Sequence, residues 1–145
     1  MNFLSSLLTV VHFIGLGLAV GAASVKVVLL LKCKSDSAMV PVYLKVVRPI
    51  TKVLITGIIL LTLSGIIWLI DGYPFSTELI IKSVLVALIW ILGPIIDNVA
   101  EPKFKQLLPT VDQPASPEFV AIMNKYFALE ILATALFYII IIYWA

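Results

Sequence analysis

The stretch NFLSSLLTVVHFIGLGLAVGAASVKVVLLL, residues 2–31, decides the class of this protein. Only two titratable side chains, His12 and Lys26, interrupt it, and it exceeds the roughly 20 apolar residues that cross a bilayer core. The rest of the 145-residue chain is similar, with 62% hydrophobic residues, 12% charged residues and a mean hydropathy of +1.16. A soluble domain carries about 25% charged residues, so only lipid can cover this much apolar surface. The chain is therefore predicted to be an integral membrane protein.

Four apolar segments are long enough to span a membrane, at about residues 3–31, 40–70, 78–96 and 119–145. Backbone polar groups in lipid must bond within their own segment, so each segment is expected to be a helix. The sequence thus predicts a single all-α domain over residues 1–145, a polytopic bundle of four transmembrane helices. Gly93-Pro94 predicts a kink or break in the third helix. The four prolines of residues 97–118 predict an irregular loop after it.

Charge distribution predicts the orientation of the chain and limits its partners. Five basic residues surround the first connection against a single acidic one, Asp36: they are Lys32, Lys34, Lys45, Arg48 and Lys52. Positive charge marks the cytoplasmic side, so both termini are predicted to lie outside the cytoplasm. The net charge of +2, without a basic arm, excludes a nucleic-acid partner. Cys33 is the only cysteine, which excludes an internal disulfide.

His12 is the only histidine, and at membrane depth an imidazole is costly unless it is satisfied or used. At helical spacing it shares one stripe with four other residues: Gly15, Ala19, Ala23 and Lys26. Gly17 and Gly21 add a GxxxG spacing beside this stripe. Small residues let another helix approach closely, so His12 is expected to face protein, and the chain is expected to form an oligomer. A functional histidine and a hydrogen-bonded packing histidine both fit this pattern.

Glu130 is the second titratable residue that the sequence places deep in a helix, in LEILATALF, residues 129–137. A carboxylate there needs a partner or a proton. His12 and Glu130 lie ~16 Å and ~22 Å below the outer ends of their helices, at 1.5 Å per residue. If the two helices are neighbours, the pair could form a proton or cation site. A structural hydrogen bond to a neighbouring helix is the alternative interpretation of Glu130.

Three features together resemble a known group of proteins. His12 precedes a small-residue stretch, KVVRPITKVLITGIILLTLSG (residues 45–65) opens the second helix, and IKSVLVALIW (residues 81–90) carries Lys82 into the third. Over about two-thirds of its length the chain resembles the HemJ-type protoporphyrinogen oxidases and the related CopD-like small bacterial membrane proteins. The resemblance implies a haem b cofactor with His12 as axial ligand and with Arg48 and Lys82 meeting the propionates. It also implies location in the bacterial cytoplasmic membrane.

The chain departs from that group because it has no second histidine. Two histidines on one haem would therefore have to come from two copies of the chain. A different second ligand, such as Met123, is the alternative.

Three functions from different classes follow. The first is a HemJ/CopD-like haem-binding or redox protein centred on His12. The second is a small transporter or channel subunit with a proton or cation site at His12 and Glu130. The third is a non-catalytic accessory subunit of a larger membrane complex. Soluble catalysis is disfavoured, since the sequence contains no P-loop, GxSxG or HExxH motif.

Overall fold

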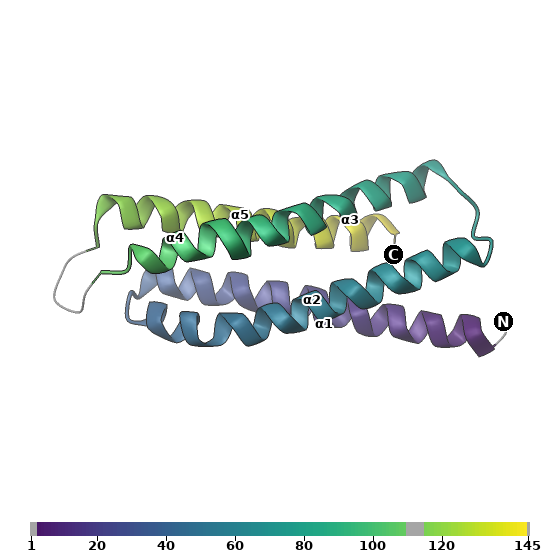
Figure 1. Ribbon diagram of the computed structural model, residues 1–145, viewed down its shortest axis with the longest axis horizontal. Helices are drawn as coiled ribbons and strands as arrows, with labels where there is room; N and C mark the ends of the chain where they lie inside the picture. Colours follow the sequence, from purple (N-terminus) through teal and green to yellow (C-terminus); the bar gives the residue numbers. More distant parts are fainter. Residues whose placement is uncertain (1–2, 110–114, 145) are drawn as a thin grey trace. The chain divides into compact units, whose positions relative to one another are not determined.

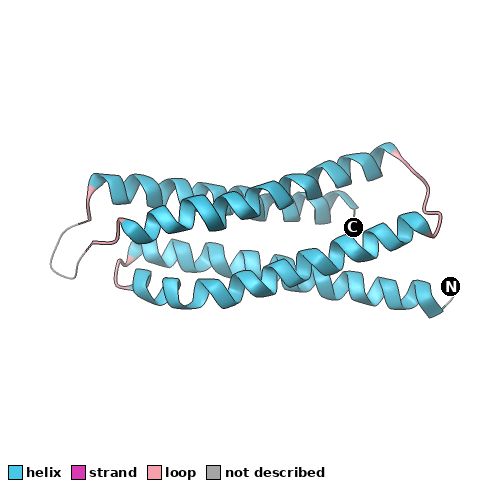
Figure 2. Cartoon of the chain, in the orientation of Figure 1, coloured by secondary structure: helices cyan, strands magenta, loops and turns pink. Residues whose placement is uncertain are grey.

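The computed structural model describes residues 3–109 and 115–144, and these residues are almost entirely helical (Figures 1 and 2). No strand occurs in these two ranges. In chain order the elements are α1 (Phe3–Ser35), α2 (Met39–Ile70), α3 (Thr77–Ile95), the π-helix η1 (Ile96–Ala100), α4 (Glu101–Gln106) and α5 (Pro117–Trp144). The predicted all-α class is confirmed.

Within the described residues, four helical segments are long and apolar enough to cross a membrane: Phe3–Ser35, Met39–Ile70, Thr77–Gln106 and Pro117–Tyr143. They agree with the four predicted spans in number and in order. The predicted end of the last span, Ala145, lies outside the described residues. The protein is therefore an integral membrane protein. The chain forms two compact units, Met1–Ile81 and Lys82–Ala145.

In the first unit, α1 and α2 form an antiparallel hairpin that crosses at very close range (Figure 1). A methyl group added to Gly57 would lie 2.5 Å from the backbone nitrogen of Ala19 and 2.7 Å from the carbonyl oxygen of Gly15. The two backbones are thus in direct contact, and only glycine fits at this point. Gly15, Ala19, Ala23 and Lys26 are all buried, as the predicted protein-facing stripe requires.

The GxxxG pair of α1 takes no part in this crossing. Gly17 and Gly21 are exposed, and a methyl group added to either would meet no atom within 4 Å. The close contact in the hairpin is made instead by the neighbouring glycine, Gly15, together with Ala19. The Gly15/Ala19 pair and the Gly17/Gly21 pair lie on different faces of α1, because they are offset by two residues and each residue turns the helix by about 100°.

The third span is longer than predicted. The helix is not ended at Gly93-Pro94 and continues through η1 and α4 to Gln106, past the predicted end near Ile96. Membrane helices tolerate proline where neighbouring groups satisfy the freed backbone atoms. The π-helix η1 ends at Ala100, two residues before Pro102, which has no N–H, and the N–H of Glu101 after it bonds to the carbonyl of Ile96. The predicted irregular loop is therefore wrong over residues 97–106.

An aromatic cluster joins α4 to α5 in the second unit. The Phe104 ring stacks on Phe119 at 5.3 Å between centroids and on Tyr126 at 5.5 Å. All three side chains are buried. Lys105 and Glu101, one turn apart on α4, form an ion pair. Stacked aromatic pairs of this kind contribute about 0.5–1.5 kcal/mol beyond the area they bury, which stabilises the α4–α5 contact.

Candidate functional site

The crossing of α1 and α2 brings His12 against the second helix. His12 lies about one turn before Gly15 on α1, and Ser64 lies about two turns after Gly57 on α2. Because the two helices are antiparallel, both residues lie on the same side of the crossing. The Nδ1 atom of His12 is 2.8 Å from the Oγ atom of Ser64, a hydrogen-bonding distance.

The other contacts of Ser64 favour one position for the imidazole proton. Its hydroxyl donates to the carbonyl oxygen of Leu60 at 2.7 Å and lies 3.1 Å from that of Leu61. A serine hydroxyl has one hydrogen, and when that hydrogen points to either carbonyl the serine oxygen is left to accept from the Nδ1–H of His12; we assign the proton to Nδ1 on this ground. In the neutral imidazole the lone pair then lies on Nε2. An unprotonated Nε2 is the ring nitrogen through which a neutral histidine can bind a metal or accept a proton.

Trp68 completes the site from the next turn of α2. The His12 and Trp68 rings are 5.0 Å apart between centroids and inclined by 42°. A hydrogen bond on one edge of the imidazole and a tryptophan ring against it together limit how the ring can turn. We call His12, Ser64 and Trp68 the His12 site.

The donor set limits the kind of metal that the protein could bind here. Among the described residues, no three or more His, Cys, Asp or Glu side chains are grouped closely enough to hold a metal ion. A bare metal centre is therefore not formed within that part of the chain. The residues do fit a haem that takes one ligand from this chain, because ligating histidines commonly donate their second ring N–H to an oxygen acceptor, and the Ser64 oxygen lies 2.8 Å from Nδ1 of His12.

Arg48 is not brought to His12. It is exposed on α2, sixteen residues before Ser64, which corresponds to ~24 Å along the helix axis. A haem ligated by His12 does not extend that far, so the implied contact between Arg48 and a propionate of the same haem lacks geometric support. Lys82 is half-buried on α3, and Met123 is buried on α5. Both belong to the second unit, and their relation to His12 remains a prediction.

Glu130 is buried in α5, with 2% of its surface exposed. Tyr126 and Thr134, one turn on either side, are also buried, so three polar side chains follow one another on a single face. The Thr134 hydroxyl oxygen has no hydrogen-bond partner among the described residues. The proposed pairing of His12 with Glu130 would join the two units and remains a prediction.

Ser64 and Trp68 were not identified as partners of His12 from the sequence. Their four-residue spacing in SGIIW, residues 64–68, places them on one face of a helix. A serine and a tryptophan on one face of an apolar helix would have been a usable signal. This signal identifies partners of His12 only when the register of α1 against α2 is known, because that register brings this face of α2 to His12.

No protein-family model, no curated protein and no solved structure matches this chain. The resemblance to HemJ- and CopD-like proteins consequently rests on the residues quoted above.

Proposed function

We propose that this protein is a HemJ/CopD-like membrane protein with a haem-binding or redox role, in which His12 is an axial ligand through Nε2. The 2.8 Å contact between Nδ1 of His12 and Oγ of Ser64, with the hydrogen assigned to Nδ1, is the observation that carries the proposal. It supports the proposal because it puts the lone pair on the ligating nitrogen and holds the ring in one orientation. Trp68 adds an apolar contact to the same ring.

The chain's own residues would position this ligand at a defined depth. The Gly15–Gly57 contact determines the register of α1 against α2, and that register brings Ser64 level with His12. When bound, a haem would supply one-electron redox chemistry at its iron. A second axial ligand would come from His12 of another copy or from Met123, and the first of these would require a homo-oligomer.

The absorption spectrum of the full-length protein tests this proposal. Protein produced in haem-sufficient cells and purified in detergent is expected to show a Soret band, with a haem content that is stoichiometric with the chain or with its dimer. A spectrum without that band, and no band on adding haem to the purified protein, would overturn the proposal.

A small transporter or channel subunit is the second candidate, and the burial of Glu130 favours it. Ionisable groups inside membrane helices commonly mark proton or ion pathways. Absence of a Soret band, together with proton flux in liposomes that is lost in Glu130→Gln, would select this function. Isolation of a stable protein only with partner subunits, and without a cofactor, would select the accessory role.

We infer that the protein lies in the bacterial cytoplasmic membrane with both termini outside the cytoplasm. The basic residues around the α1–α2 turn support this orientation, because lysine and arginine accumulate in cytoplasmic loops. A reporter enzyme that is active only outside the cytoplasm is expected to be active when fused after Ala145. The same reporter inserted at Ser37, in the turn, is expected to be inactive. The opposite pattern would reverse the orientation.

A further inference from the structure

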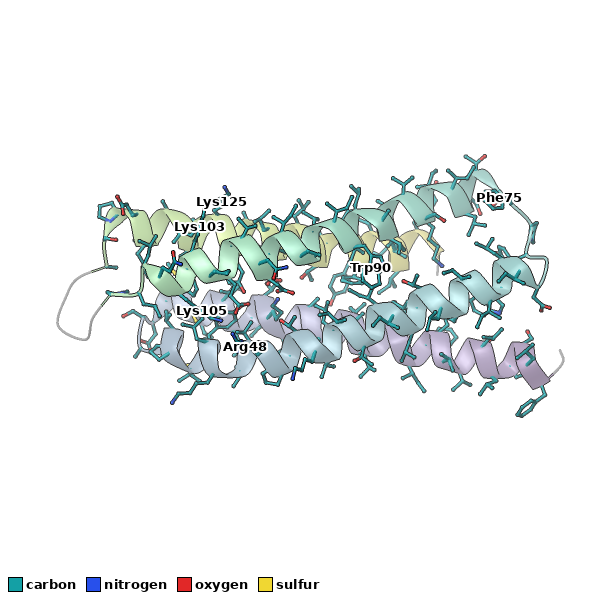
Figure 3. The ribbon with its side chains drawn as sticks, in the orientation of Figure 1. Arg48, Phe75, Trp90, Lys103, Lys105 and Lys125 are labelled. Atoms are coloured by element: carbon teal, nitrogen blue, oxygen red, sulfur yellow. The ribbon has the colours of Figure 1, made fainter. Side chains whose placement is uncertain are left out.

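One face of α2 carries three exposed basic side chains, Lys45, Arg48 and Lys52 (Figure 3 labels Arg48). Their spacing of three and then four residues places them on the same side of the helix, within ~10 Å along its axis. We call them the basic triad.

The opposite face of α2 holds the triad outward. Tyr43 and Val47 lie at the same level of the helix and are fully buried, with 0% of their surface exposed. Rotating α2 to hide the triad would therefore expose this part of the core. The direction in which the three basic side chains point is thus a property of the fold.

No carboxylate of the α1–α2 hairpin, residues 3–70, forms an ion pair with the triad. Asp36 is the only acidic residue between positions 3 and 70, and its Oδ1 accepts a hydrogen bond from the backbone N–H of Ala38. Within the described part of that unit, no ion pair joins Asp36 to Lys45, Arg48 or Lys52. The triad therefore presents three exposed positive charges that are available to an anion from outside the hairpin.

The triad lies at the level where a membrane carries its phosphates. The apolar part of α2 runs from Val53 to Ile70, about 27 Å at 1.5 Å per residue, close to the ~30 Å of a hydrocarbon core. Lys52 immediately precedes this part, and Arg48 and Lys45 follow one and two turns further out. The three charges therefore extend from the edge of the hydrocarbon into the headgroup region.

The same face continues as an apolar track. Beyond Lys52, exposed branched side chains recur every three or four residues: Ile55, Ile59, Leu63, Ile66 and Ile70. The track spans ~22 Å, whereas one leaflet of the hydrocarbon core is ~15 Å deep. It is thus long enough to accompany a whole acyl chain, and it begins directly beside the triad.

We propose that this face of α2 binds one anionic glycerophospholipid of the surrounding bilayer. The phosphodiester lies at Arg48, whose planar guanidinium forms paired bonds to phosphate oxygens, and Lys45 and Lys52 flank it as point charges. One acyl chain lies along the track that begins at Ile55. The apolar track favours a lipid over free phosphate, which would use only the charged end.

Native mass spectrometry of the full-length protein tests the proposal. The protein is equilibrated with vesicles of equal parts phosphatidylglycerol and phosphatidylcholine and then extracted in mild detergent. The wild-type chain is expected to retain one phosphatidylglycerol in preference to phosphatidylcholine. The double substitution Arg48→Gln/Lys52→Gln is expected to weaken retention about 25-fold, at about fivefold for each charge removed near a membrane surface.

A matched control removes two exposed charges elsewhere. Lys32→Gln/Lys125→Gln lowers the net charge equally but leaves the triad intact, and it is expected to retain the lipid as the wild type does. Millimolar inorganic phosphate is expected not to displace the lipid. If the double variant fails to insert, Lys45→Gln carries the test with an expected fivefold loss. Equal retention of the two lipids, equal loss in the control, undiminished retention in the triad variants, or displacement by phosphate would each overturn the proposal.

Discussion

Replacing Gly57 by alanine is expected to destabilise the hairpin by about 3 kcal/mol, at the upper end of the usual cost of overfilling a packed interior. The added methyl group would lie 2.5 Å from a backbone nitrogen and 2.7 Å from a backbone oxygen. Neither atom belongs to a side chain that can turn away, so α1 and α2 must separate. The free energy of unfolding in detergent, measured by denaturant titration, is the quantity to compare.

Gly65→Ala is the matched control on the same helix. A methyl group added to Gly65 would meet no atom within 4 Å, and alanine favours helix over glycine by about 1 kcal/mol. This variant is expected to be at least as stable as the wild type. If Gly57→Ala unfolded at the same denaturant concentration as Gly65→Ala, the direct contact of the two backbones at this point would be contradicted.

The parts of the fold that follow from local pattern were predictable from the sequence. Span number depends on apolar length alone, and all four spans were found. The buried face of α1 depends on helical periodicity, and Gly15, Ala19 and Ala23 are buried as that periodicity requires. Which glycine spacing meets α2 was not predictable in this way, because GxxxG describes one helix and the contact involves two.

The third span shows where proline signals mislead. Pro94 and Pro102 lie eight residues apart in one continuous helical segment, and each alone suggests an end. The chain instead passes between them through a π-turn. A π-turn changes which carbonyl accepts a hydrogen bond from each N–H. Its presence therefore depends on the whole hydrogen-bond pattern of the helix and not on either proline alone.

The residues of the candidate site also divide into those that a local sequence pattern reveals and those that only the contact between helices reveals. His12 stands out from sequence because a histidine in an apolar helix is unusual. Ser64 is an unremarkable residue until the register of the hairpin puts it 2.8 Å from Nδ1. The residues around Arg48 are part of the resemblance to the HemJ- and CopD-like proteins, yet the distance along α2 separates Arg48 from His12. A resemblance in sequence compares the types and the order of residues. Which of these residues can contact the same ligand depends on their depth in the membrane.

His12→Ala is expected to abolish haem binding completely, and Ser64→Ala is expected to weaken it by about 10- to 100-fold, the usual cost of losing the partner of a ligating histidine. Removing the serine hydroxyl leaves the Leu60 and Leu61 carbonyls in their helix but takes the acceptor from Nδ1–H. The imidazole then loses both its orientation and its preference for the lone pair on Nε2. Haem titration followed at the Soret band measures both effects.

Ser64 is a positioning residue in this scheme, so its replacement must change more than stability. Ser64→Thr keeps the hydroxyl and is expected to restore affinity and the Soret maximum, whereas Ser64→Ala shifts the maximum and the reduction potential. Thr9→Val is the matched control, since the Thr9 hydroxyl makes a similar bond to the Ser5 carbonyl at 2.9 Å, one turn from His12. Its expected spectrum is that of the wild type. A Soret band that survives His12→Ala, or that is equally altered by Thr9→Val and Ser64→Ala, would remove His12 and Ser64 from the roles assigned to them.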